Sequence, residues 1–102
     1  MKTLKESDIE DYLVTRVKAF GGEVRKVKWI GRKSAPDRVV MLASRSSLTT
    51  TIWVELKRPG LCATFPKDAH ERAQYREHER MRRVGQRVVV IDSFQGVDEL
   101  LS

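Results

Sequence analysis

The chain has 102 residues, 40% of them hydrophobic and 33% charged, which fits a single globular domain over residues 1–102. Its net charge of +6, from 20 Lys and Arg against 14 Asp and Glu, favours polyanionic partners such as nucleic acids. One cysteine, no apolar run of the ~20 residues that span a bilayer, and no N-terminal signal sequence argue against a disulfide framework, a membrane anchor and secretion, so we expect a cytoplasmic protein.

The first regular segment predicts a helix over about 7–20. Its apolar residues recur at helical spacing, at positions 9, 12, 13, 17 and 20. Ser7 and Glu10 have the spacing of a capping box at the start of this helix, and Gly21 and Gly22 are expected to end it.

The rest of the chain predicts four strands, two further helices and the loops between them. Apolar and β-branched runs predict strands over 23–30, 37–43, 50–57 and 86–92, and polar periodicity predicts helices over about 68–84 and 93–101. The first three strands suit an antiparallel meander, and the fourth arrives through a helical crossover, so it should run parallel to a neighbour. We therefore predict an α/β fold with a small mixed sheet flanked by helices.

The third strand contains two charged residues, Glu55 and Lys57, in an otherwise apolar segment. Because side chains alternate along a strand, residues 52, 54 and 56 form an apolar face, whereas Glu55 and Lys57 lie on the other face, two residues apart. An acid two residues before a lysine is expected about once by chance in this composition, so a solvated ion pair is an alternative interpretation.

Asp37 opens the second strand and could join this charged pair. A symmetric hairpin centred on Ser46 and Ser47 would place Asp37 opposite Leu56, and so beside both charged residues. Two carboxylates at one point repel each other unless a cation neutralises them, and oxygen donors favour Mg²⁺ or Mn²⁺ over zinc. The alternative is an aspartate that merely opens a strand after a proline turn.

Residues on the two longer helices could also reach this site. Glu10 lies beside the apolar stripe of the first helix, although its place in a capping box is a sufficient local explanation. The second helix has His70, Gln74 and His78 on one stripe; the histidines are too far apart for one metal ion and are interpreted as surface or partly packed residues. The basic segment 79–87 is interpreted as a solvated helix end rather than a phosphate-binding comb.

These residues resemble a known family. Glu10 on a helix, Ala-Pro-Asp at 35–37, Glu-Leu-Lys at 55–57 and Gln74 on the next helix are similar to the PD-(D/E)xK nuclease superfamily. More narrowly, the segments GRKSAPDRVVML, VELKRPG and AQYREHERMRRVGQRVVVIDS resemble the VRR-NUC (virus-type replication-repair nuclease) domain, over about residues 7–100. Ala35 stands where family members often have glycine. The resemblance implies a restriction-endonuclease-like αβββαβ core.

The resemblance also implies roles for individual residues. Lys57 would hold or deprotonate the attacking water, and Gln74 would orient Lys57 or the water. The ligands of Mg²⁺ or Mn²⁺ would be Asp37, Glu55, the backbone carbonyl of Leu56 and Glu10. Basic residues on or next to the flanking loops are candidates for phosphate contacts: Lys28, Arg32, Lys33, Arg58 and Lys67.

The family and the small size of the chain lead to a specific expectation. We expect a metal-dependent, structure-selective DNA endonuclease that acts as a homodimer on branched DNA, four-way (Holliday) junctions first. The alternatives are a flap or general DNA endonuclease with the same chemistry, a nuclease subunit that needs a partner protein, and a basic nucleic-acid-binding module without catalysis.

Overall fold

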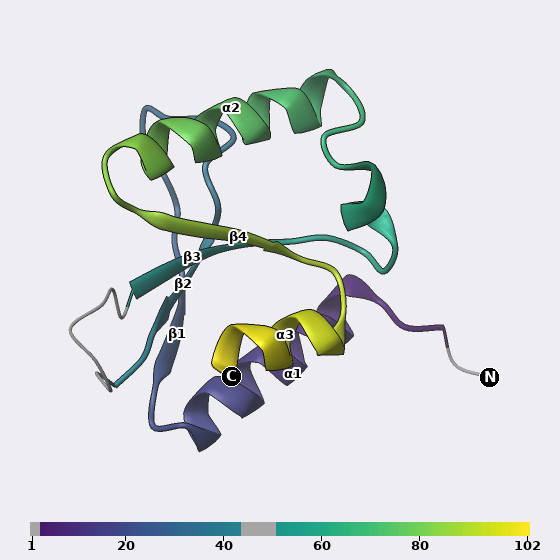
Figure 1. Ribbon diagram of the computed structural model, residues 1–102, viewed down its shortest axis with the longest axis vertical. Coiled ribbons are helices and arrows are strands. Elements are labelled where there is room, and N and C mark those ends of the chain that lie inside the picture. The colour runs from purple at the N-terminus through teal and green to yellow at the C-terminus, as the bar shows by residue number, and fades with distance from the viewer. Residues whose placement is uncertain (1–2, 44–50) are drawn as a thin grey trace.

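A computed structural model describes residues 3–43 and 51–102 of the chain. One mixed sheet lies between two helical layers, with α1 and α3 on one face and α2 across the other (Figure 1). The elements in chain order are α1 (Glu6–Ala19), β1 (Glu23–Lys26), β2 (Arg38–Met41), β3 (Thr51–Leu56), the 3₁₀ turn η1 (Leu61–Thr64), α2 (Ala69–Arg83), β4 (Arg87–Ile91) and α3 (Phe94–Leu101). In these ranges no helix is long and apolar enough to cross a membrane.

The sheet has the predicted topology. Its strand order is β1-β2-β3-β4; β2 is antiparallel to both β1 and β3, and β4 is parallel to β3. β1 ends at Lys26, four residues before the predicted end of that strand. One more backbone hydrogen bond joins Val27 to Asp37, and the chain then faces Pro36, which has no N–H to offer a ladder. The indole of Trp29 instead donates a hydrogen bond to the carbonyl of Pro36 at 2.8 Å.

The register between β2 and β3 differs by one residue from the predicted hairpin. Arg38 pairs with Val54 and Val40 with Ile52, so the expected pairing of Asp37 with residue 56 is wrong; the predicted centre at positions 46 and 47 lies outside the described residues. The observed register keeps Val40 and Ile52, both fully buried, on one face, whereas a slip of one residue would turn one strand's apolar set away from the core. Extended by one residue, the observed register sets Asp37 across from Glu55.

The hydrophobic core lies between the sheet and the layer of α1 and α3. Ile9, Leu13 and Val17 of α1 are fully buried, as the helical spacing predicts, and they pack against the apolar face of β3. Val97 and the two leucines that end α3 close the same core. The face of β3 that carries Glu55 and Lys57 therefore points away from this core and toward α2.

The start of α1 differs from the predicted capping box. The helix begins at Glu6, and the Asp8 carboxylate accepts a hydrogen bond from the backbone N–H of Lys5 at 2.8 Å. Ser7 and Glu10 both lie inside the helix, so the proposed box between them is wrong. Glu10 is therefore not needed for capping, and its side chain reaches the sheet.

Candidate active site

The inner face of α2 is polar, and it covers the charged face of β3. Asp68 caps the helix, because its side chain accepts a hydrogen bond from the backbone N–H of Glu71 at 2.8 Å. The buried residues of this helix are all polar: Glu71, Gln74, Glu77 and His78. Residues 71, 74 and 78 lie on one stripe of a helix, and each of them contacts a charged side chain of β3 or of the residue that follows it.

The ammonium group of Lys57 is fixed by this stripe. Its Nζ donates a hydrogen bond to Oε1 of Gln74 at 2.6 Å and lies 3.3 Å from Oε2 of Glu71. It also lies 5.2 Å from the ring centroid of Phe65, within range of a cation–π contact. The structure thus brings Lys57 and Gln74 together, and Lys57 is only 8% exposed. The amine is held in one place with little freedom to rotate.

Glu71 was not found from the sequence, although it contacts the central lysine. Its Oε1 accepts a hydrogen bond from the backbone N–H of Lys67 at 2.8 Å, while Oε2 faces Lys57. The spacing of Asp68 and Glu71 matches a capping box at the start of α2, which is the signal that could have indicated it. The second role, as an ion-pair partner, depends on how α2 is rotated over the sheet.

Glu55 contacts a histidine that the sequence led us to place at the surface or partly packed. His78 is fully buried; its Nε2 lies 3.3 Å from Oε1 of Glu55, and its ring stacks on Phe65 with centroids 5.9 Å apart. Nδ1 of this ring has no hydrogen-bond partner among residues 3–43 and 51–102. The earlier interpretation holds for His70, which is exposed, and is wrong for His78.

Glu10 and Asp37 are joined by a guanidinium group. Arg38 forms an ion pair with Asp37 (Nη1 to Oδ1, 2.9 Å), and its Nη2 bonds to the carboxylate of Glu10. Burial alone would lower the pKa of Arg38, but the carboxylates of Glu10 and Asp37 together outweigh burial and raise this pKa. Arg38 is therefore the cation that neutralises these two acids, a role not expected from the sequence.

The donor types at this end of the sheet fit a hard divalent cation. Glu10, Asp37, Glu55 and the backbone carbonyl of Leu56 offer oxygen atoms alone, which suits Mg²⁺ or Mn²⁺. Within the described ranges, no three His, Cys, Asp or Glu side chains are grouped closely enough to hold a metal. The acids are distributed instead between two partners, Arg38 for Glu10 and Asp37, and His78 for Glu55.

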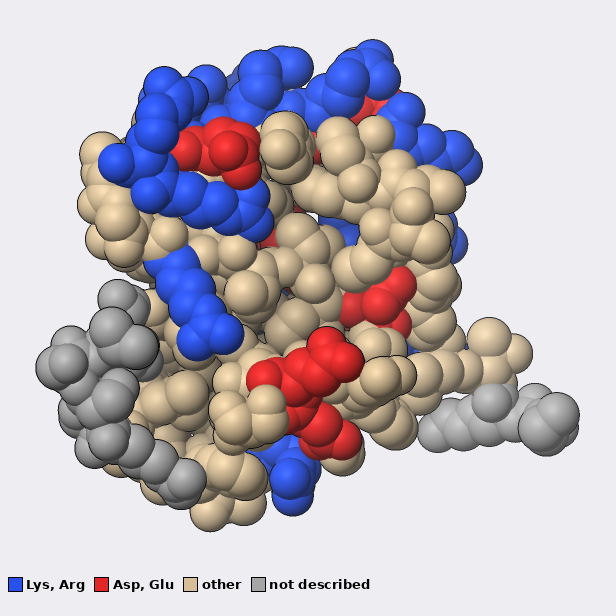
Figure 2. Space-filling view, viewed as in Figure 1, with Lys and Arg blue, Asp and Glu red and all other residues tan. Residues whose placement is uncertain are grey.

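Basic side chains gather on the side of the molecule formed by α2 (Figure 2). The predicted phosphate contacts Lys28, Lys33, Arg58 and Lys67 are exposed. Arg32 is about half exposed and is bound to Glu77 of α2 through two hydrogen bonds. The hydrogen bond from Arg32 is the main reason that the pKa of Glu77 is lowered.

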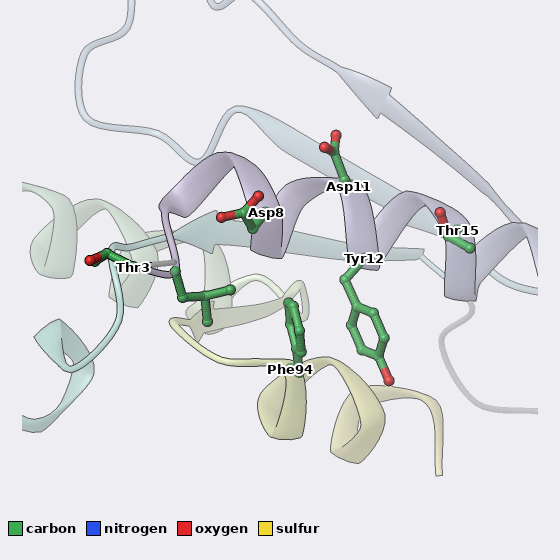
Figure 3. A pocket seen from close by; sticks show the side chains of 7 residues that line it. Thr3, Asp8, Asp11, Tyr12, Thr15 and Phe94 are labelled. Atoms are coloured by element: carbon green, nitrogen blue, oxygen red, sulfur yellow. The ribbon is translucent and has the colours of Figure 1, made fainter. Parts of the chain in front are cut away.

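A more apolar hollow, of about 370 Å³, lies on the other side of the sheet. Its wall includes the stacked rings of Tyr12 and Phe94, 4.3 Å apart, beside the first turns of α1 (Figure 3). The site residues Glu10, Asp37, Glu55, Lys57, Glu71 and Gln74 are not among the residues that line it. The charged face of β3 beneath α2, not this hollow, is therefore the candidate active site.

The sequence and the fold are similar to those of known proteins. No family model matches the chain. A protein of Acyrthosiphon pisum secondary endosymbiont phage 1, described as "Putative nuclease p44", is 37% identical over 93 residues, which cover 91% of this chain and 88% of that protein. A solved structure described as "VRR_NUC domain" is 36% identical, covers 94% of this chain and 92% of its own, and superposes with a TM-score of 0.71. A second, described as "VRR_NUC domain protein", shares the fold with a TM-score of 0.68 at 18% identity, over 98% of this chain and 87% of its own.

Proposed function

Since this chain belongs to the VRR-NUC family of nucleases, we propose that it is a divalent-metal-dependent DNA endonuclease whose single domain spans residues 1–102. The observation that supports this most is the pairing between β3 and α2. Glu55 and Lys57 are each only 8% exposed, and each is held by a side chain of α2. A merely solvated ion pair would not need two buried charges with separate buried partners, because burial of charge is costly.

In this proposal the side chains divide the work of phosphodiester hydrolysis. Asp37, Glu55, the carbonyl oxygen of Leu56 and Glu10 would hold the divalent ion, which supplies Lewis-acid charge to the scissile phosphate. Lys57 would hold or deprotonate the attacking water and stabilise the negative charge that develops on the phosphate.

The contacts of Lys57 explain how its amine is positioned for this role. Gln74 and Glu71 fix Nζ from the side of α2, so no reorganisation of the lysine is needed when the phosphate arrives. The ring of Phe65 covers the ammonium group and limits access of bulk water to it.

We further propose that the substrate is branched DNA, four-way junctions first, and that a homodimer cuts it. Resolving such a junction requires two symmetric cuts, and one protomer supplies one set of Asp37, Glu55 and Lys57. The net charge of +6 and the basic side of α2 favour a substrate in which several duplex arms converge.

Cleavage of four-way junction, flap and linear duplex, side by side with Mg²⁺, Mn²⁺ or EDTA, tests the proposal. We expect metal-dependent cleavage that is fastest on the junction, and a loss of at least about 100-fold for Asp37→Asn. Asp11→Asn is the matched control, because Asp11 is an exposed acid next to Glu10 and outside the proposed site. This substitution makes the same change of charge as Asp37→Asn. Binding in EDTA should be nearly equal for both variants.

One result would contradict the nuclease function, and another would contradict only the junction preference. Wild-type protein that binds junctions in EDTA but never cuts any of the substrates with either metal would be a binding module instead. Cleavage of flap or linear duplex as fast as junction would retain the nuclease and remove the junction preference. Sedimentation of the complex measures whether two protomers bind one junction.

A further inference from the structure

A cationic cleft lies next to the candidate active site and takes no part in the chemistry proposed above. It has a volume of about 340 Å³ and is formed between the loop 31–34 and one flank of α2. Four of its seven lining residues are cations: Arg32, Lys33, Arg76 and Arg80. The last two come from α2 and were not among the predicted phosphate contacts. Arg80 belongs to the segment that the sequence suggested was a solvated helix end.

One buried carboxylate holds two of these guanidinium groups in place. Arg32 donates to Glu77 from Nε (2.9 Å) and from Nη2 (2.7 Å), and Arg80 donates from Nε at 3.0 Å. The side chain of Glu77 is 5% exposed, whereas those of Arg32 and Arg80 are 48% and 49% exposed. The arginines are therefore anchored at one edge, and they keep N–H donors on the other edge for a ligand.

The charges of the cleft do not cancel. The carboxylate of Glu77 offsets one of the four cations, so a positive excess remains beside α2. Anchored guanidinium groups are the donors best suited to a phosphate, because their fork geometry matches two of its oxygens.

The cleft shares both of its walls with the candidate active site. The loop 31–34 continues through Pro36 into Asp37, and Ala73 of the cleft precedes Gln74, the partner of Lys57. Arg80 is six residues beyond Gln74, which is about 9 Å along a helix axis. Phosphates of one DNA strand are about 3.4 Å apart along the duplex axis, so for a duplex that lies along α2 this distance corresponds to two or three nucleotides.

We propose that this cleft is a second phosphate site, which holds the cleaved strand two or three nucleotides from the scissile phosphate. The inference rests on the proposed nuclease function and adds a role for Arg76 and Arg80, with Glu77 as the residue that positions Arg32 and Arg80. Its ligand is a DNA phosphate, either an internal phosphodiester or a terminal phosphomonoester.

The test measures binding of a four-way junction in EDTA, so that no cutting occurs, at several salt concentrations. For Arg76→Gln we expect weaker binding, with the slope of log K against log salt reduced by about 0.9, the contribution of one phosphate contact. Arg83→Gln is the matched control: it is exposed, lies on the same helix and removes the same charge outside the cleft. Equal slopes for both variants would overturn the proposal.

Glu77→Gln gives a second test, because the proposal predicts a change in DNA affinity opposite to the change that net charge alone predicts. Removal of an acid raises the net charge, and it should strengthen DNA binding if charge alone mattered. If Glu77 instead positions Arg32 and Arg80, the variant should bind more weakly than wild type. Stronger binding would refute the anchoring role. Circular dichroism melting of each variant confirms that it is folded.

Two comparisons identify the source of the phosphate and separate this inference from the proposed function. An Arg76→Gln effect that persists on strands without terminal phosphates identifies an internal phosphodiester; an effect that requires a 5′-phosphate identifies a phosphomonoester. If wild type cleaves DNA while Arg76→Gln and Arg83→Gln behave alike, the cleft proposal fails and the nuclease stands. If wild type neither binds nor cleaves DNA, both fail.

Discussion

Replacement of Lys57 by methionine should destabilise the fold as well as abolish cleavage, because the lysine is half of a buried ion pair. Methionine keeps the length of the side chain but removes the charge. The carboxylate of Glu71 would then lose its partner at 3.3 Å while only 11% of its side chain is exposed. It would keep one hydrogen bond, from the backbone N–H of Lys67 at 2.8 Å.

The size of the effect follows from this geometry. Two unit charges 3.3 Å apart attract by about 5 kcal/mol at an effective dielectric constant of about 20, before the cost of desolvation is subtracted. Removal of one partner of a buried pair costs about 3–5 kcal/mol. Because Glu71 retains a hydrogen bond, we expect about 3 kcal/mol for Lys57→Met. For a chain of this length, that lowers Tm by about 12–24 °C.

A double-mutant cycle separates stability from catalysis. Urea unfolding, followed by circular dichroism, is measured for wild type, Lys57→Met, Glu71→Gln and the double variant. The double variant should be about 1–2 kcal/mol more stable than Lys57→Met, since it no longer buries an unpaired carboxylate, yet it should remain inactive. A coupling energy below about 0.5 kcal/mol would refute the ion pair. Cleavage by Lys57→Met at the wild-type rate would refute the catalytic role.

Three further predictions concern α2. His78→Leu should lower the free energy of unfolding by about 1–3 kcal/mol more than His78→Gln, because leucine leaves the Glu55 carboxylate buried without this partner; equal losses in urea would contradict the contact. The pKa of Glu77 is lowered by Arg32, so its stabilisation is full above the unfolded value of about 4.3 and is lost as pH falls through the folded pKa. The difference in unfolding free energy between wild type and Glu77→Gln should therefore shrink from pH 6 to pH 3. A constant difference would refute the stabilisation by the ionised Glu77 carboxylate. In native-state hydrogen exchange, amides of α2 should open at a lower free energy than those of α1; equal protection would contradict a weakly held α2.

The elements that depend on simple periodicity were predictable from the sequence. Ile9, Leu13 and Val17 repeat at helical spacing and are fully buried in α1, and the alternation around Val54 correctly separated the core face of β3 from its charged face. The crossover helix also fixed the parallel direction of β4. These features depend on which residues are buried, and the tendency to be buried is a property of the residue type itself.

Details that depend on a shift of one residue were not predictable. The sequence predicts a capping box on Ser7 and Glu10, whereas Asp8 caps the helix from inside its first turn. The predicted strand register also differs by one residue from the observed register, because a symmetric hairpin assumes a turn geometry that the sequence does not specify. The register is decided by burial of Val40 against Ile52, a pairing between two strands that neither strand reveals alone.

Partners of the site residues were missed for a different reason. Arg38 lies on the core face of its strand, where an arginine is not expected, yet its guanidinium extends to Glu10 and Asp37. Glu71 and His78 flank Gln74 on one stripe of α2, but that helix has few apolar residues to show which side faces the sheet. A polar stripe indicates an inner face only when the opposite strand is known to be charged.

The two faces of the sheet therefore contribute differently to stability and to chemistry. On the side of α1 and α3, buried aliphatic side chains such as Ile9 and Val97 supply the hydrophobic free energy that folds the chain. On the other side, the buried residues of α2 itself are polar, and their hydrogen bonds contribute about 1 kcal/mol each after the loss of water contacts. The inner face of α2 is therefore held by polar contacts, whereas the hydrophobic core lies on the opposite side of the sheet. The apolar layer thus allows α2 to carry buried charged residues, because none of the residues of this helix belongs to the hydrophobic core.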